Sequence, residues 1–188
     1  MYVVIEGIDT AGKSTQLALL KEKLPNAIFT KEPGGTNLGV KLRTMALNGE
    51  AKSKIAEMFL FMADRAEHIE EVIKHNKNNT IISDRSMISG IAYASALSID
   101  KLIELNLIAT NNVLPTHVIL LELTPSELKF RLSQKENDSI ELRGIDYLIN
   151  IQNRMKETIK RLSINHVIID AGLEIKEIEK RIEEFING

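Results

Sequence analysis

Cysteine is absent from this sequence of 188 residues. Its absence excludes a disulfide scaffold, a thiolate zinc site and a cysteine nucleophile. An excess of positive charge is also missing, because 24 Lys and Arg residues stand against 26 Asp and Glu residues, for a net charge of −2. Non-specific nucleic-acid binders and membrane-surface proteins rely on such an excess. We therefore expect no nucleic-acid partner, and any anion must be bound by a local site.

Long hydrophobic runs are absent as well. No run approaches the ~18 apolar residues of a membrane span, and the first residues, MYVVIE, lack the basic segment of a signal peptide. We expect no membrane partner and a cytoplasmic location. The composition, 44% hydrophobic and 27% charged, is typical of a globular protein. The length predicts one domain over residues 1–188.

Short apolar runs alternate with longer segments of helical period. The runs, which we predict to be strands, cover residues 2–5, 27–30, 80–83, 117–123 and 166–169. Helices are predicted to begin near Lys13, Leu38, Ser53, Ser89, Asp100, Pro125, Gly144 and Glu174, with a single helix over residues 53–75. This alternation indicates an α/β fold whose parallel sheet is covered on both faces. Residues 133–144 are mostly polar and have the composition of a mobile loop.

A phosphate-binding loop follows the first predicted strand. The sequence GIDTAGKST satisfies G-x-x-x-x-G-K-[ST] between a strand and a helix. In such a loop the backbone N–H groups cradle a phosphate, the lysine reaches the β- and γ-phosphates, and the hydroxyl that follows can ligate Mg²⁺. We expect the lysine to face solvent until nucleotide binds. The predicted ATP-binding residues are Gly7, Ile8, Asp9, Thr10, Ala11, Gly12, Lys13, Ser14 and Thr15, with Ser14 as a Mg²⁺ ligand.

The loop alone does not separate a kinase from a GTPase switch or a mechanical ATPase. A guanine-reading N-K-x-D is missing, because residues 76–79 read NKNN, and no D-x-x-G lies outside the phosphate loop. These two absences disfavour a GTPase. Asp84, which follows the apolar residues 81–82 and Ser83, has the position of an acid that holds Mg²⁺ in an ATPase, but Arg85 follows it at once.

Four sequence blocks, taken in order, point to a known family. They are EGID at 6–9, TKEPGGT at 30–36 followed by Leu42 and Arg43, LFMADRAEH at 60–68, and DRSMISGIAY at 84–93. With these blocks the chain resembles the thymidylate kinase family of nucleoside monophosphate kinases, from residue 3 to about residue 171. A weaker fifth block, residues 138–141, falls in the position of the family's lid loop.

The resemblance implies a fold and a reaction. The fold is the P-loop NTPase three-layer sandwich, a five-stranded parallel sheet flanked by helices, with a short lid at about residues 133–144. The reaction is transfer of the γ-phosphoryl of ATP to dTMP, with Mg²⁺, giving ADP and dTDP for dTTP synthesis and DNA replication. A homodimer is also implied.

The resemblance also assigns roles to individual residues. Toward dTMP, Asp9 faces the sugar and phosphate, Arg43 grips the phosphate, Phe61 stacks on thymine, Arg65 bonds its exocyclic oxygen, and Tyr93 excludes a 2′-hydroxyl; Glu32, Ser89 and Gly90 complete this site. Toward ATP, Arg85 bridges the donor and acceptor phosphates, Asp84 reaches Mg²⁺ through water, and Arg131 and the turn at 170–171 lie beside adenine.

The sequence departs from the family pattern at several positions. Ser86 replaces a usual aromatic residue, Gly90 replaces a frequent Ser or Asn, and Ala94 replaces a frequent Gln that bonds thymine, so base selection is expected to be looser. Thr10 and Ser139 stand where family members carry arginines.

Because of these departures, the family pattern does not identify the catalytic arginine of the lid. Arg143 is our hypothesis for it, beside Lys13 and Arg85 as catalytic residues. The histidines at 68, 75, 117 and 166 have no metal-ligand spacing, and we assign them no chemistry. Two other functions stay open: a kinase for a different nucleoside monophosphate, and a nucleotide-binding switch without phosphoryl transfer.

Overall fold

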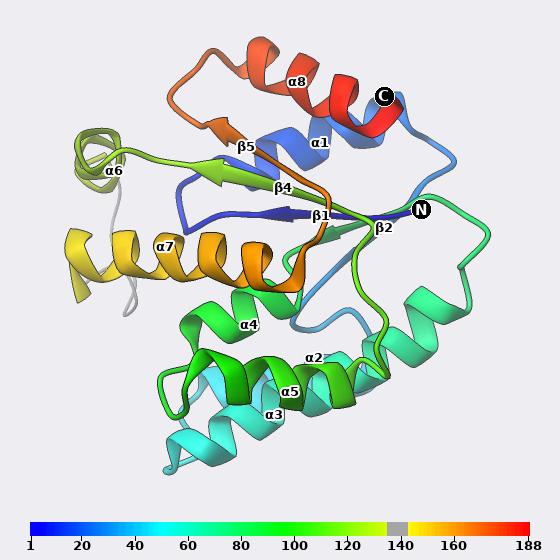
Figure 1. Ribbon diagram of the computed structural model, residues 1–188, viewed down its shortest axis with the longest axis vertical. Helices are drawn as coiled ribbons and strands as arrows, with labels where there is room; N and C mark the ends of the chain where they lie inside the picture. Colours follow the sequence, from blue (N-terminus) through cyan, green and yellow to red (C-terminus); the bar gives the residue numbers. More distant parts are fainter. Residues whose placement is uncertain (135–142) are drawn as a thin grey trace.

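The computed structural model describes residues 1–134 and 143–188. Five strands form one parallel sheet in the order β2-β3-β1-β4-β5 (Figure 1). Their bounds are Tyr2–Glu6 (β1), Ile28–Lys31 (β2), Ile81–Asp84 (β3), His117–Glu122 (β4) and His166–Asp170 (β5). All five predicted strands are present, each displaced by no more than one residue at either end.

The central strands are buried on both faces, which explains their continuous apolar sequences. Val3, Val4 and Ile5 in β1 have no exposed surface, and neither do residues 118–121 in β4. The edge strand β2 is only half-buried, and β5 alternates between exposed and covered positions. In the parallel register Ile5 lies opposite Asp84, so the carboxyl ends of β1 and β3 meet at one edge of the sheet. In such sheets this edge is where ligands bind.

Helices cover both faces of the sheet (Figure 1). On one face lie α1 (Lys13–Lys23) and α8 (Ile175–Asn187), which contact each other. On the other face lie α4 (Met87–Tyr93) and α7 (Ile145–Leu162), while α6 (Pro125–Leu132) packs against α7.

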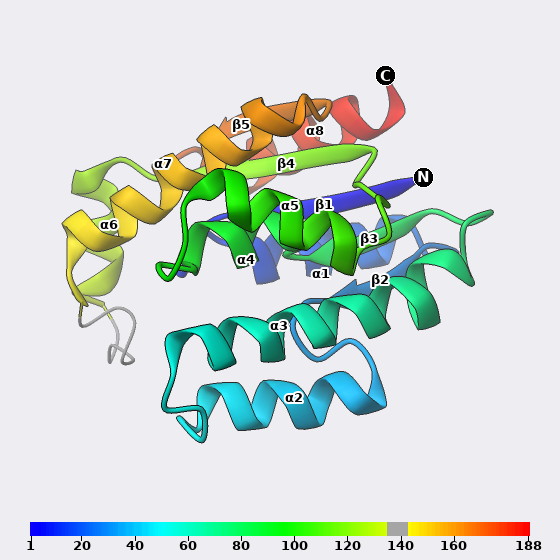
Figure 2. The same ribbon diagram turned by 60° about the horizontal axis from the view of Figure 1, so that its bottom comes forward.

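A second group of helices packs outside α4. It contains α3 (Lys54–His68), α5 (Ile99–Ala109) and α2 (Asn37–Leu47), and α2 lies along α3 farthest from the sheet (Figure 2). Met58, Met62, Met87, Ile91 and Leu102 form a hydrophobic cluster that fixes α3 and α5 against α4. The acceptor residues predicted on α3 and α4 are therefore held at a fixed mutual position.

Side-chain caps set where several helices begin. Thr36 Oγ1 accepts a hydrogen bond from Gly39 N ahead of α2, and Ser53 Oγ accepts one from Ile55 N ahead of α3. Ser86 caps α4, which therefore begins two residues before the predicted Ser89.

The predicted single helix over 53–75 is divided in the structure. The α-helix α3 ends at His68 and is followed by a π-helical segment, η1 (Ile69–Lys74). Among the described residues no helix is both long and apolar enough to cross a bilayer.

Candidate active site

The phosphate loop joins β1 to α1 at the carboxyl edge of the sheet. Gly7 has φ +152°, and a Cβ there would lie 2.9 Å from the carbonyl oxygen of Leu121, so no larger residue fits. Gly12 has φ +90°, a left-handed conformation that favours glycine. Among the described residues no side chain caps the start of α1. Its first N–H groups are thus available to an anion, as a phosphate site requires.

Lys13 lies inside this loop, and our prediction that it faces solvent is wrong. Only 8% of the residue is exposed, and its Nζ donates to the carbonyl oxygens of Gly7 and Ile8 at 3.0 and 3.1 Å. Burial, with a smaller effect of the Arg85 charge, lowers the pKa of Lys13 to about 8. The ammonium is therefore positioned by the loop backbone.

Arg85 connects the phosphate loop to α4. Its Nη2 pairs with Asp9 Oδ1 at 2.5 Å, and its Nη1 donates to Gly7 O at 3.0 Å and to Ser89 Oγ at 2.9 Å. Its Cζ lies 5.5 Å from the centre of the Tyr93 ring. Arg85 also has φ +69°, a conformation that is strained for a non-glycine residue. The structure thus brings together Asp9, Arg85, Ser89 and Tyr93, as the resemblance implies.

Glu6 is a residue of this site that our sequence analysis did not assign. Its fully buried carboxylate accepts hydrogen bonds from Ser86 Oγ at 2.7 Å and Ser89 Oγ at 2.5 Å. Burial raises the pKa of Glu6, while Ser89, Arg85 and Ser86 oppose this rise. The contact with Glu6 accounts for the serine at position 86. An acid at the end of an otherwise apolar, buried strand is the sequence signal that would have identified it.

A buried polar network surrounds Arg65 on α3. Arg65 Nε donates to Glu32 Oε2 at 2.8 Å, and Arg65 Nη1 donates to Asn106 Oδ1 at 2.6 Å. His68 Nδ1 donates to Glu32 Oε1 at 2.8 Å, and its Nε2 shares a 2.7 Å hydrogen bond with the Thr30 hydroxyl. Burial works against ionisation of Glu32, but Arg65 and His68 lower its pKa overall. Glu32 therefore holds Arg65 in place rather than facing solvent.

Arg43 lies over the turn that follows β2. Its Nη1 donates to Pro33 O at 3.1 Å, which leaves the rest of the guanidinium available to a phosphate. The turn is itself held by Asp64, whose Oδ1 accepts from Gly34 N at 2.8 Å. Burial raises the pKa of Asp64. Asp64, like Asn106, escaped our sequence analysis because its contact depends on how α3 packs against a distant turn.

Phe61 and Tyr93 have the partial exposure that ligand contacts require. Phe61 is half-buried one turn before Arg65 on α3, while Met58 and Met62 occupy the core positions beside it. The Tyr93 hydroxyl is buried and has no hydrogen-bond partner among the described residues. Gly90 lies against the Arg65 guanidinium.

Arg131 lies beside the phosphate loop, where the resemblance places adenine. Its Nη1 donates to Thr10 O at 2.9 Å and its Nη2 to Ala171 O at 2.6 Å. Glu127 Oε1 accepts from its Nε at 2.7 Å. The predicted turn at 170–171 and the phosphate loop are thus linked through one arginine.

Arg143, the predicted lid arginine, points elsewhere in the described part of the chain. It is exposed, it donates from Nη1 to Tyr147 OH at 3.1 Å, and its Cζ lies 5.1 Å from that ring's centre. Within residues 1–134 and 143–188, no hydrogen bond or ion pair joins it to the phosphate loop. Most of the predicted lid, with Ser139, falls at 135–142 and lies outside the described residues.

The oxygen atoms at the loop fit a Mg²⁺ ion. Asp84 Oδ1 is buried without a hydrogen-bond partner among the described residues, and Ser14 is exposed at the start of α1. Mg²⁺ prefers oxygen ligands and usually takes one or two from the protein, with the rest from phosphates and water. Ser14 and Asp84 therefore suit this ion, as the sequence predicts.

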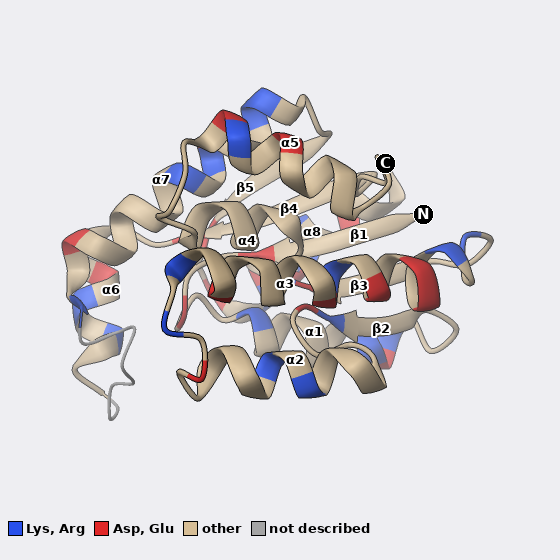
Figure 3. Ribbon diagram, turned by 90° about the horizontal axis from the view of Figure 1, so that it is seen from below, with Lys and Arg blue, Asp and Glu red and all other residues tan. Residues whose placement is uncertain are grey.

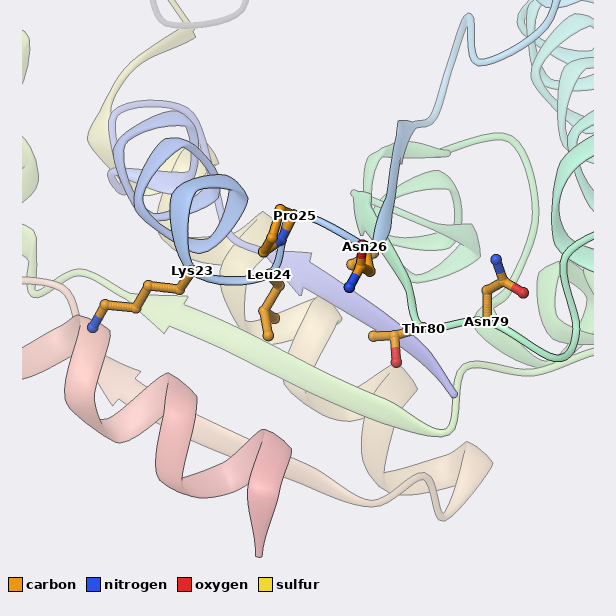
Figure 4. Close-up of a pocket in the computed structure, with 7 residues that line it drawn as sticks. Lys23, Leu24, Pro25, Asn26, Asn79 and Thr80 are labelled. Carbon is orange, nitrogen blue, oxygen red and sulfur yellow. The ribbon is translucent and has the colours of Figure 1, made fainter.

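A hollow of about 420 Å³ lies away from this site (Figure 4). Residues 23–27, 79 and 80 line it, and these residues precede β2 and β3. It is thus at the amino edge of the sheet, opposite the phosphate loop. Its single charged residue, Lys23, is already paired with Glu179 and Glu183. We assign it no role in the chemistry.

Comparison with known proteins gives one family. The sequence model of that family, described as thymidylate kinase, matches residues 5–182. A thymidylate kinase of Aliarcobacter butzleri is 78% identical over 187 residues, which cover 100% of this chain and 99% of that protein. One from Wolinella succinogenes is 56% identical over 182 residues, covering 97% and 96%.

A solved structure supports the fold independently. The crystal structure of thymidylate kinase from Ehrlichia chaffeensis matches with a TM-score of 0.78 at 22% identity, covering 100% of this chain and 98% of that one. The predicted five-stranded parallel fold is thereby confirmed. The matched residues 5–182 also include all four sequence blocks on which the resemblance was based. The chain therefore belongs to the thymidylate kinase family.

Proposed function

We propose that this member of the thymidylate kinase family transfers the γ-phosphoryl of ATP to the phosphate of dTMP, giving ADP and dTDP. The position of Arg85 carries the proposal. Its guanidinium contacts the phosphate loop through Gly7 O and Asp9, and α4 through Ser89. It lies between a site suited to ATP phosphates and the helix that carries Tyr93, beside which the proposal places the deoxyribose.

The chemistry follows from charge. The second pKa of a phosphate monoester is about 6, so an oxygen of dTMP is already an anion near neutral pH and needs no general base. That oxygen attacks the γ-phosphorus, and the bond from the γ-phosphorus to the oxygen of the β-phosphate breaks as ADP leaves. The protein must position two anions and neutralise their charge. Lys13, Arg85 and Arg43 supply that charge.

Ser14 and Asp84 would hold Mg²⁺ beside Lys13. When bound, the ion neutralises the β- and γ-phosphate oxygens and orients them. Arg131 would lie beside adenine, while Phe61 and Arg65 would contact the thymine ring. Because its proposed substrates are free nucleotides, we place the reaction in the cytoplasm.

A panel of acceptors tests the proposal. ADP release from ATP and Mg²⁺ is measured with dTMP, dUMP, dCMP, dGMP, UMP and AMP. We expect release that depends on dTMP, with dUMP only about 10- to 100-fold poorer, because one methyl group is worth ~1–3 kcal/mol. Higher activity with another nucleoside monophosphate would reassign the substrate. ATP binding without acceptor-dependent release would indicate a nucleotide-binding switch instead.

We also propose a homodimer built on α2 and α3. Exposed hydrophobic side chains gather on these two helices: Leu38, Val40, Met45, Leu47, Ile55 and Phe59. Helix α2 carries only Lys41 and Arg43 as charged residues, and Figure 3 shows how little charge lies along it. A second copy of the chain is the partner that the family implies. Contiguous apolar surface of this kind marks interaction sites.

The dimer is tested by sedimentation of a charged variant. Phe59→Glu places a carboxylate on a residue of α3 that is 51% exposed, so it should give a monomer without unfolding the chain. Ile175→Glu, on a residue that is 53% exposed on α8 across the sheet, is the matched control and should leave the dimer intact. A monomeric wild type, or a Phe59→Glu dimer of unchanged stability, would contradict this interface.

A further inference from the structure

Asn106 on α5 contacts Arg65 although it lies outside every sequence block used above. The residue is 1% exposed, and its Oδ1 accepts from Arg65 Nη1 at 2.6 Å. Its Nδ2 donates to the carbonyl oxygen of Leu102, one turn earlier, at 2.7 Å. This second bond fixes which end of the amide faces the arginine. Asn106 is therefore held as an acceptor for Arg65.

Gly90 bounds the guanidinium on another side. A Cβ at this position would lie 2.4 Å from Arg65 Nη2 and 2.9 Å from both Cζ and Nη1. Separations of that size are too short for real contacts, so an alanine at position 90 would force the guanidinium to move. The Glu32 carboxylate binds the guanidinium at Nε, and the Asn106 amide binds it at Nη1. The absence of a side chain at Gly90 leaves the space that the group occupies.

The hydrogen-bond donors of Arg65 are only partly used. A guanidinium has five N–H groups, of which Glu32 accepts one and Asn106 accepts another. Neither group on Nη2 is donated to a described residue. A single bond at Nε leaves the guanidinium plane free to tilt about that bond. The second bond, to Asn106, fixes the tilt of the guanidinium plane. It therefore also sets the direction in which the unused N–H groups point.

We propose that Asn106 is a positioning residue for base selection, and that Gly90 gives the space in which it holds Arg65. The inference rests on the proposed function, in which Arg65 faces the base. Thymine carries an exocyclic carbonyl at C4, which accepts from a guanidinium, whereas cytosine carries an amino group, which does not. A site built around a hydrogen bond rejects an analogue that cannot make it far more strongly than an apolar pocket does. Asn106 thus contributes to the rejection of cytosine nucleotides.

The test uses Asn106→Leu, which keeps the number and branching of the side-chain heavy atoms and removes the acceptor. KM and kcat are measured for dTMP, dCMP and ATP, and dTMP binding is measured by calorimetry. We expect KM for dTMP to rise by up to about 10- to 100-fold, the range for loss of a hydrogen bond from a charged donor to the ligand, because Arg65 is no longer directed at the base. The ratio of kcat/KM for dTMP over dCMP should fall, while KM for ATP stays unchanged.

Thr110→Val is the matched control. Thr110 is 2% exposed at the C-cap of the same helix, and its hydroxyl donates to a backbone carbonyl, that of Leu107, rather than contacting Arg65. It should lose comparable stability and keep the wild-type ratio of dTMP to dCMP. If the ratio of dTMP to dCMP changes in Asn106→Leu but not in Thr110→Val, the change comes from the position of Arg65 and not from a general loss of packing.

Gly90→Ala keeps the inference testable should Asn106→Leu fail to fold. Alanine favours a helix, so this variant should fold, and it should reproduce the changed ratio by displacing Arg65. In the double variant the two effects should be less than additive, because both act through one guanidinium. Wild-type KM and ratio in either folded single variant would overturn the inference. A wild-type chain without dTMP-dependent ADP release would overturn the proposed function, and the inference with it.

Discussion

Lys13 carries its charge at a place from which water is largely excluded. Burial lowers its pKa to about 8, so the side chain is cationic below that pH and loses its proton above it. A bound polyphosphate favours the protonated form. ATP binding should therefore take up a proton as pH rises past 8. Affinity should fall by up to about tenfold per pH unit in that range, by linkage.

Calorimetry in buffers of different ionisation enthalpy measures that proton uptake directly. Lys13→Met is the control, and it should bind ATP weakly with no uptake between pH 8 and 9.5. It should still fold, because Gly7 O keeps its hydrogen bond from Arg85 and Ile8 O keeps one from Ala11 N. An uptake that persists in Lys13→Met would assign the titration to another group.

The sequence identifies candidate site residues most directly where they fall in one short motif. Lys13 and the loop glycines were assigned from their spacing alone. The roles of Asp9, Arg85 and Tyr93 came from the family blocks, and the structure brings these three together. Asn106 escaped prediction because its contact with Arg65 joins positions 41 residues apart on different helices. The burial of Lys13 escaped because the loop carbonyls that accept its hydrogen bonds have no sequence signal.

At the scale of elements, strands were easier to predict than helix packing. A strand buried on both faces has a continuous apolar run, and all five runs gave strands. Helix starts were found within about two residues where Thr36, Ser53 or Ser86 provides a cap. The division between α3 and η1 has no such signal, and the pairing of α2 with α3 depends on the tertiary fold.

Arg154 of α7 binds three backbone carbonyl oxygens at the carboxyl end of α4, in addition to the packing between the two helices. Arg154 Nε donates to Ala92 O at 2.8 Å, and its Nη2 donates to Ile91 O at 3.0 Å and Ala94 O at 2.8 Å. Arg154→Ala should lower the free energy of unfolding by about 2–3 kcal/mol, because carbonyls of a packed helix end lose charged donors. Urea unfolding measures this change.

Arg161, on the same helix, is the control for Arg154. It is 42% exposed and pairs at the surface with Asp100 and Glu157. Surface pairs of this kind contribute about 0–1 kcal/mol, so Arg161→Ala should unfold nearly as the wild type does. Equal losses in the two variants would show that the contacts of Arg154 with α4 carry no special stability.

The arginine that we predict to act in the lid lies two residues before the start of α7. Arg143 stacks on Tyr147 in the structure. Our proposal therefore requires it to leave this contact when both nucleotides are bound. Arg143→Ala should lower kcat strongly, since such an arginine is worth up to ~10³–10⁵ in rate. Equilibrium binding of dTMP should stay within a few-fold. A wild-type kcat would transfer the role to Arg85 or Arg131.

At the scale of the whole molecule, donor and acceptor sites meet at one edge of the sheet. The phosphate loop follows β1, and Asp84 ends β3 with Arg85 directly after it. The turn after β2 is held beneath Arg43. The acceptor helices α3 and α4 are locked to that edge by a shared hydrophobic cluster. This arrangement suits direct transfer between two nucleotides and does not need a phosphorylated protein side chain.

The fate of the γ-phosphoryl tests this account most directly. The protein is incubated with Mg²⁺, dTMP and ATP labelled in the γ-phosphate, and the labelled products are separated. The account predicts that the label appears in the β-phosphate of dTDP, in equal amount with ADP, and that Lys13→Met abolishes its transfer. Label released as inorganic phosphate without dTDP would contradict the account, because the loop would then hydrolyse ATP rather than transfer its phosphoryl group.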